Sequence, residues 1–121
     1  MRYALLCYHQ EDVVCAWSKE EDAAVMAEIA AVKARLGAKV GLNLRLMPTT
    51  TATSLKKDRE PPLVIDGPFA ETKEQLLGLY LLECTSLDEA IEIAKELGTA
   101  NPGGTYEIRP VGYFDEKGGA S

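Results

Sequence analysis

The stretch LLGLYLLECTSLDEAIEIAKELG, residues 76–98, contains a strand followed by a helix and decides the fold. Leu76 to Cys84 is apolar on both faces, which is typical of a central strand in a sheet. Ser86-Leu87-Asp88-Glu89 is a capping box, a signal of a helix N-terminus. An apolar stripe at helical spacing follows, formed by Leu87, Ala90, Ile91, Ala94 and Leu97. Gly98 then favours a helix end.

The same two elements occur near the N-terminus. Tyr3–Tyr8 is a short apolar strand, and Ser18-Lys19-Glu20-Glu21 is another capping box. The predicted helix ends at Gly37 and carries an apolar stripe of Val25, Ile29, Val32 and Leu36.

Two further strands have weaker patterns. Residues 40–46 and 106–109 alternate apolar and polar side chains, which is typical of edge strands with one apolar face. Between Pro48 and Pro62 the pattern loosens, and Leu63-Val64-Ile65 then resumes an apolar run. We expect an inserted hairpin or a long loop there, because connections of this length are uncommon inside compact domains.

The predicted order is β-α-β-β-α-β, the plan of ferredoxin-like α+β domains with an antiparallel sheet. Right-handed crossovers give the strand order 4-1-3-2, with the first and third strands in the centre. Both helices cover one face of this sheet. The other face of the central strands is apolar, so we expect a homodimer in which a second sheet covers it. Alternatively, the C-terminal segment 112–116 folds back as a lid.

Composition narrows the class of protein. A chain of 121 residues fits one domain, which we assign to residues 1–114, with a flexible C-terminal tail over 115–121. The formal charge of −6 disfavours nucleic acids and anionic membranes as partners. Three cysteines without CxxC spacing, and an N-terminal apolar run too short for a signal peptide, lead us to expect a cytoplasmic protein.

Antiparallel pairing of the first and third strands predicts a site at one edge of the sheet. The end of the first strand, with His9, should lie beside the segment 66–75 that precedes the third strand. His9 and Asp66 form the candidate catalytic pair, because a carboxylate can orient a histidine that exchanges protons near neutral pH. The same cleft would hold Thr51, Thr53, Glu71, Lys73 and Glu74, and Tyr80 is a further candidate for the ligand pocket.

Structural roles explain several of these residues too. His9 fits an exposed histidine after a strand, and Asp66-Gly67-Pro68 fits a rigid turn. Thr72–Gln75 resembles a capping box for one helical turn, Tyr80 fits the sheet core, and Arg109 fits an ion pair on an edge strand. One histidine and scattered cysteines provide no zinc site, and no phosphate-binding glycine loop is present, so we expect no metal and no cofactor.

The run Asp66-Gly67-Pro68-Phe69-Ala70-Glu71-Thr72-Lys73-Glu74-Gln75-Leu76 closely resembles the DGPF-domain branch of the YCII-related family. The resemblance extends over roughly residues 1–112. It implies a dimeric ferredoxin-like α/β barrel. Some members of the wider family look like small-molecule lyases with a His–Asp pair, and DGPF relatives are often linked to sigma factors, which implies a regulatory partner. The family's histidine lies in the first helix; Ser18–Leu36 contains none, so that residue cannot be carried over.

Two functions remain open from the sequence. One is the binding of a small molecule or a sigma-factor-linked regulatory partner at a cleft beside Asp66–Phe69. The other is a cofactor-independent lyase or isomerase reaction that uses His9 and Asp66 as an acid/base pair.

Overall fold

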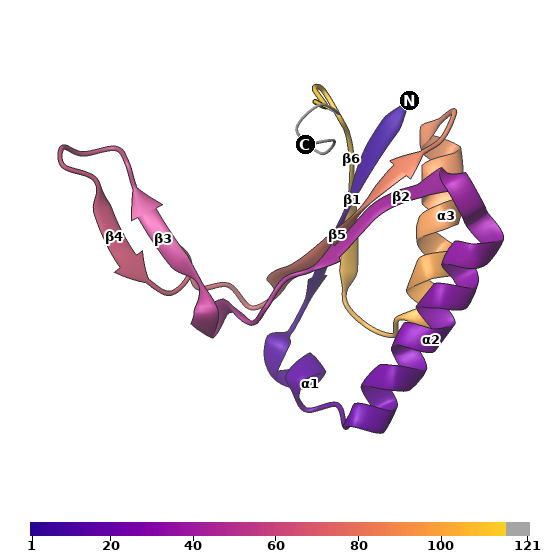
Figure 1. Cartoon of the computed structure of the whole chain (residues 1–121), viewed down its shortest axis with the longest axis horizontal. Coiled ribbons are helices and arrows are strands. Elements are labelled where there is room, and N and C mark those ends of the chain that lie inside the picture. The colour runs from indigo at the N-terminus through magenta and orange to yellow at the C-terminus, as the bar shows by residue number, and fades with distance from the viewer. Residues whose placement is uncertain (116–121) are drawn as a thin grey trace.

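A computed structural model describes residues 1–115 as a mixed α+β fold (Figure 1). Its strands are β1 (Arg2–His9), β2 (Val40–Arg45), β3 (Thr53–Lys56), β4 (Leu63–Asp66), β5 (Gln75–Glu83) and β6 (Thr105–Pro110). Its α-helices are α1 (Glu11–Cys15), α2 (Lys19–Leu36) and α3 (Leu87–Ala100). Short 3-10 turns precede β2 (Gly37–Lys39) and β3 (Thr49–Thr51). The helices and strands expected outside the insert are therefore present.

Four of the strands form an antiparallel sheet in the order β2-β5-β1-β6. The two strands that are apolar on both faces, β1 and β5, lie in its centre. Helices α2 and α3 pack side by side on one face, as Figure 1 shows. This arrangement is consistent with a ferredoxin-like fold. No helix in the described part of the chain is long and apolar enough to cross a membrane.

The hydrophobic core lies between the sheet and the two long helices. Leu5 of β1, Leu82 of β5 and Leu97 of α3 are its largest fully buried side chains. Ile29 and Val32 are the buried part of the stripe predicted on α2. The Ser18 hydroxyl accepts from the backbone N–H of Glu21, and the Glu21 carboxylate accepts from that of Ser18, so the predicted capping box is confirmed.

The opposite face of the sheet, which we call the outer face, has no helix over it. The register places Leu44, Leu79 and Leu6 in one row across β2, β5 and β1, and Leu81 beside Ala4 in the next row. These side chains are half-buried in the single chain. Charged pairs flank them, formed by Arg2 with Glu83 and by Arg109 with Glu107 at 3.8 Å. The ion pair expected at Arg109 is thus present.

The segment considered as a lid reaches only one end of the outer face. The Phe114 ring lies over the Arg2 guanidinium, 4.7 Å from ring centroid to Cζ, while Tyr113 is exposed. Leu6 and Leu81 stay partly accessible. Residue 116 and the rest of the expected tail, apart from Asp115, lie outside the described residues.

The insert forms a hairpin that extends away from the body of the molecule (Figure 1). β3 and β4 pair with each other in a separate two-stranded sheet, with Thr53 opposite Asp66 and Leu55 opposite Val64. We call this hairpin, residues 53–66, the arm. Gly67 ends it with φ of 102°, a left-handed conformation that favours glycine, so the turn expected at this motif is present.

Some local expectations were wrong. Helix α3 continues through Gly98 to Ala100, because Leu97 and Ala100 are both buried against the sheet. No helical turn forms at Thr72, whose hydroxyl donates instead to the Glu74 carbonyl. The short helix α1 had not been expected.

Candidate functional site

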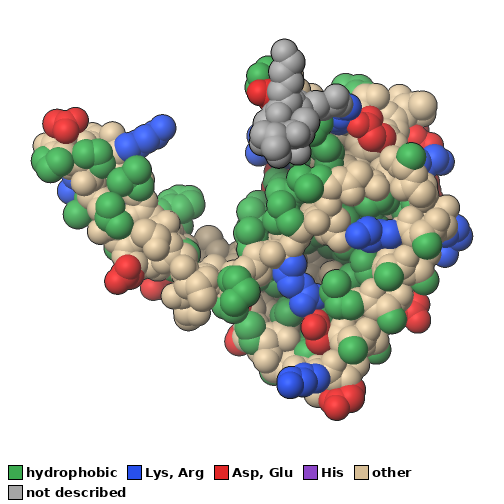
Figure 2. Space-filling model, viewed as in Figure 1, with side chains coloured by type: hydrophobic (Ala, Val, Ile, Leu, Met, Phe, Trp, Pro, Cys, Tyr) green, Lys and Arg blue, Asp and Glu red, His purple; other side chains and the backbone are tan. Residues whose placement is uncertain are grey.

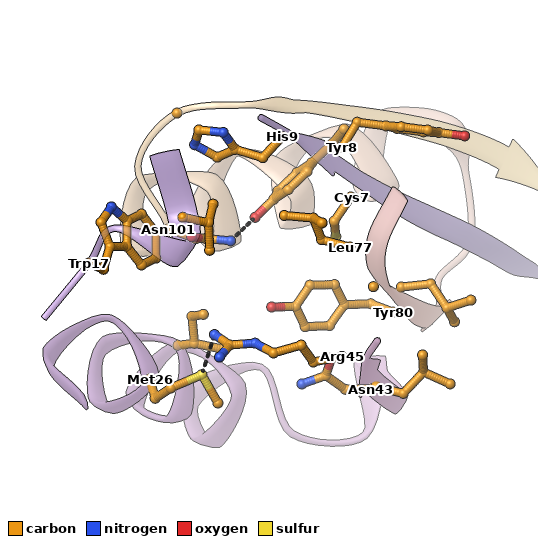
Figure 3. A pocket seen from close by; sticks show the side chains of 17 residues that line it. Cys7, Tyr8, His9, Trp17, Met26, Asn43, Arg45, Leu77, Tyr80 and Asn101 are labelled. Carbon is orange, nitrogen blue, oxygen red and sulfur yellow. Dashed lines mark hydrogen bonds between the residues drawn. The ribbon is translucent and has the colours of Figure 1, made fainter. Parts of the chain in front are cut away.

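A cavity of about 240 Å³ opens between the helix-covered face of the sheet and the N-terminal half of α2. Six elements reach it: β1, α1, α2, β2, β5 and β6, together with the segment after α3. Its polar or aromatic lining residues include Tyr8, His9, Trp17, Asn43, Arg45, Tyr80, Asn101 and Tyr106 (Figure 3). A second hollow of about 340 Å³ lies at the root of the arm and shares Val14, Trp17, Arg45 and Leu77 with the first.

Tyr80 is the central polar group of the cavity. Only 4% of its surface is exposed, yet its hydroxyl points into the open space in Figure 3. Among the described residues, none forms a hydrogen bond with this oxygen, and it is not sealed from the cavity. Burial raises the pKa of the Tyr80 hydroxyl, with smaller contributions in the same direction from Tyr106 and Cys7. The group is therefore a neutral phenol, ready to donate and accept.

Tyr106 and Asn101 place a second polar edge in the cavity. The Asn101 side-chain N–H donates to the Tyr106 hydroxyl oxygen at 3.4 Å. Burial raises the pKa of Tyr106. Because its oxygen already accepts from Asn101, the hydroxyl hydrogen of Tyr106 remains available to a ligand.

Arg45 is the positive charge of the cavity, and it is already balanced. Its guanidinium lies 3.2 Å from the Asp22 carboxylate and donates to the Met26 sulfur at 3.1 Å. Both partners are on α2, so these contacts tie the end of β2 to that helix. An anionic ligand would have to compete with the Asp22 carboxylate for this guanidinium.

His9 forms one wall of the cavity. Its Nδ1 accepts from the backbone N–H of Gln10 at 2.7 Å, so the hydrogen of the neutral ring is on Nε2. The ring meets Trp17 edge-on, with centroids 6.3 Å apart. A Cβ at Gly103 would lie 2.6 Å from Nε2, and Gly103 and Gly104 both have positive φ. Only glycine at these positions leaves room for the imidazole.

Cys7 lies on the same strand as His9, and its thiol is unreactive. Burial raises the pKa of its thiol to about 12, and its sulfur is placed to donate to the Leu5 carbonyl at 3.8 Å. A protonated thiol is a poor nucleophile. The cavity thus offers neutral hydrogen-bonding groups around an apolar floor.

The structure brings together two of the residues singled out in the sequence, His9 and Tyr80. It places Asp66 and Thr53 opposite each other on the arm, away from the cavity. Thr51 lies in the turn before the arm, and Glu71, Lys73 and Glu74 lie in the segment returning from it.

The cleft expected to join His9 to Asp66 is not formed within one chain. The reason is the register: His9 pairs with Gln75, the first residue of β5, so the residues before Gln75 leave the sheet instead of covering its edge.

Several lining residues were missed, chiefly Asn43, Arg45, Asn101 and Tyr106. The pattern of residues 40–46 predicts strict alternation, but the ladder shifts between Val40 and Asn43. As a result Asn43 lies opposite Tyr80 and Arg45 opposite Gly78, on the face toward α2. Gly41, inside a strand, was the one sequence signal of such a bulge.

Comparison with known proteins gives the family. The model of the YCII-related domain matches residues 1–115. The chain belongs to the YCII-related family. An uncharacterised protein of Rhizobium meliloti (strain 1021) is 51% identical over 117 residues, which is 94% of each chain.

Within this YCII-related domain, α2 contains no histidine. The imidazole of the cavity comes from the end of β1 instead. Its ring faces Trp17 and the glycine pair, and the lining contributed by the described residues contains no Asp or Glu.

Proposed function

We propose that this YCII-related domain is a homodimer whose subunits each bind a small, uncharged ring compound in the cavity around Tyr80. The observation that carries the proposal is the Tyr80 hydroxyl: its side chain is only 4% exposed, but the oxygen reaches the open space of the cavity and forms no hydrogen bond with a described residue. A polar group held in this way is available to orient a ligand.

The cavity size limits the ligand. A dry cavity of roughly 150 Å³ can hold benzene. The 240 Å³ available here would admit a single ring with one polar substituent. The aromatic side chain of Trp17 provides a face for such a ring, while Tyr80 and Tyr106 provide hydrogen bonds.

The electrostatics favour an uncharged compound. Arg45 is paired with Asp22, and the hydroxyls and the Cys7 thiol are held in their neutral forms by burial. A carboxylate entering this space would lose hydration without gaining a free cation.

Binding is favoured over acid/base catalysis because the described part of the cavity lining contains no carboxylate. The catalytic alternative paired His9 with Asp66, and in one chain Asp66 lies on the arm. His9 contributes instead as a wall and, through its Nε2–H, as a donor.

The homodimer is proposed from the outer face. The half-buried aliphatic row of Leu44, Leu79 and Leu6, flanked by charged pairs, has the anatomy of an interface with an apolar centre and a polar rim. Two such sheets packed face to face would form the dimeric α/β barrel, leaving the cavities on the helix-covered faces accessible.

Benzamide and benzoate test the ligand class, because they share shape and differ in charge. We expect millimolar benzamide to raise the melting temperature and benzoate to have little effect. Tyr80→Phe should remove most of the benzamide shift. Tyr3→Phe is the matched control, since Tyr3 is an equally buried tyrosine on the same sheet face and lies outside the cavity lining. Stabilisation by benzoate alone, or no loss in Tyr80→Phe, would contradict the proposal.

A further inference from the structure

The arm exposes aliphatic side chains on both of its faces. Leu55 and Val64 are opposite one another and are 60% and 63% exposed. Leu63 and Ile65 lie on the other face and are also exposed. Phe69, just beyond the end of the arm, is 90% exposed. So large a concentration of exposed apolar side chains on one projecting element marks an interaction surface.

The arm also lacks support within its own chain. Among the described residues, β3 and β4 form a sheet of their own and do not join the main sheet. An isolated two-stranded hairpin is only marginally stable in water, and both of its edges expose unpaired backbone groups. Packing against another surface would remove this weakness.

The root of the arm is nevertheless firmly attached. Glu11 of α1 accepts from the backbone N–H of Thr49 at 2.6 Å and from its hydroxyl. The Gly67 N–H donates to the Ala52 carbonyl at 2.7 Å, and the Ser54 hydroxyl donates to the Gly67 carbonyl at 2.7 Å. These bonds close the hairpin where it leaves the body and fix the direction in which it projects.

Because the arm projects in this direction, one of its sides and the outer face of the sheet border the same gap. Figure 2 shows apolar side chains on both sides of the gap between the arm and the body. Leu46 and Met47, exposed at the end of β2, connect the two surfaces along the chain. A molecule seated on the outer face would therefore also meet the arm.

We infer that the arm clasps a second copy of this chain. The inference rests on the proposed homodimer and extends it: the subunit that covers the outer face would be held by the arm of its partner. Two-fold symmetry then lets each copy give and receive one arm, so both arms become covered.

The net charge of the arm is compatible with a second copy of this chain as its partner. The whole chain has a net charge of −6, so two copies repel one another. The arm contributes nothing to that charge, because its three basic side chains, Lys56, Lys57 and Arg59, balance its three acidic ones, Asp58, Glu60 and Asp66. An element with no net charge adds no net repulsion when it approaches an acidic partner.

Analytical ultracentrifugation of three variants tests the inference. Leu55→Thr with Val64→Thr makes the arm polar but keeps its β-propensity. Val13→Thr with Leu87→Thr is the matched control, because both residues are exposed and lie outside the arm and the outer face. Leu81→Lys puts a charge in the outer face. We expect the dissociation constant of the dimer to rise about tenfold or more in the arm variant and to stay unchanged in the control.

The outcomes separate the two proposals. If Leu81→Lys is monomeric while the arm variant dimerises as tightly as its control, the homodimer stands and the arm inference fails. If the unmodified protein is a monomer, both fail. A photo-crosslinking residue in place of Val64 gives a second measurement, with light and heavy isotope-labelled chains mixed. Cross-links between light and heavy chains are expected; cross-links only within one chain would overturn the inference.

Discussion

Glu11 accepts two hydrogen bonds from Thr49, one from the backbone N–H at 2.6 Å and one from the side-chain hydroxyl. Its own backbone N–H donates to the Gln75 side chain at 3.1 Å. Through one acidic residue, α1 is tied both to the chain entering the arm and to the start of β5. Val14 of α1 and Trp17, which follows this helix, line the cavity. The segment that anchors the root of the arm therefore also forms part of the cavity wall.

Replacing Glu11 by alanine should therefore weaken the attachment of the chain entering the arm, while the backbone bond to Gln75 is kept. Hydrogen bonds to a charged group contribute about 1.5–3 kcal/mol each when partly buried, and part of that loss is recovered by water. We expect Glu11→Ala to lower the free energy of unfolding by about 1–3 kcal/mol in urea denaturation. Glu28→Ala, an exposed site in the middle of α2, should change it by less than about 0.5 kcal/mol. Equal effects of the two changes would contradict this role.

Two glycines should respond to alanine in opposite directions. A Cβ at Gly78 would lie 2.5 Å from the Leu44 carbonyl oxygen, so β2 would have to move away from β5. We expect Gly78→Ala to destabilise the protein by about 1–3 kcal/mol. A Cβ at Gly98, inside α3, would meet the Tyr106 ring at an ordinary 3.6 Å.

Gly98→Ala should then stabilise the protein by about 0.5–1 kcal/mol, because alanine loses less backbone entropy in a helix. Thermal or urea unfolding of the two variants measures both effects. A destabilised Gly98→Ala would mean that Tyr106 packs more tightly on α3 than the structure shows.

Stability should fall in alkaline solution. Burial raises the pKa of Cys7 from 9.0 to about 12 and raises that of Tyr80 as well. Below pH 9 the Cys7 thiol is protonated in the folded and unfolded states. Between pH 9 and about 12 the unfolded chain releases its proton while the folded chain keeps it, so unfolding becomes easier as the pH rises.

Cys7→Ala provides the check on that interpretation. The decline in unfolding free energy above pH 9 should be shallower in this variant, by up to about 1.4 kcal/mol per pH unit. Tyr80, Tyr106 and Cys84, whose pKa values burial also raises, contribute to the slope in both proteins. Identical slopes would show that Cys7 ionises equally in the two states.

The sequence was sufficient for the elements whose signals are local. The stripe of Val25, Ile29, Val32 and Leu36, and the capping box at Ser18, predicted α2 because both depend on neighbours within one helix. The continuous apolar runs likewise predicted β1 and β5, and the loosened pattern after Pro48 predicted the hairpin.

The site was harder to predict because it depends on register. One extra residue between Val40 and Asn43 turns Asn43 and Arg45 toward the helices, and no periodic pattern records that shift. The direction of the arm was equally hard to predict from local sequence, because the Glu11–Thr49 contact at its root joins residues 38 apart in the chain. The register that pairs His9 with Gln75 leaves Asp66 on the arm, apart from the histidine that topology alone places beside it.

The most direct measurement is a titration of protein labelled with ¹³C at the tyrosine ζ carbons, followed by NMR as benzamide is added. Tyr80→Phe and Tyr3→Phe assign the two resonances. If the cavity takes an uncharged ring compound at its unpartnered phenol, the Tyr80 resonance should move saturably while that of Tyr3 stays in place. Saturable binding of benzamide with no movement of the Tyr80 resonance would contradict the proposed site.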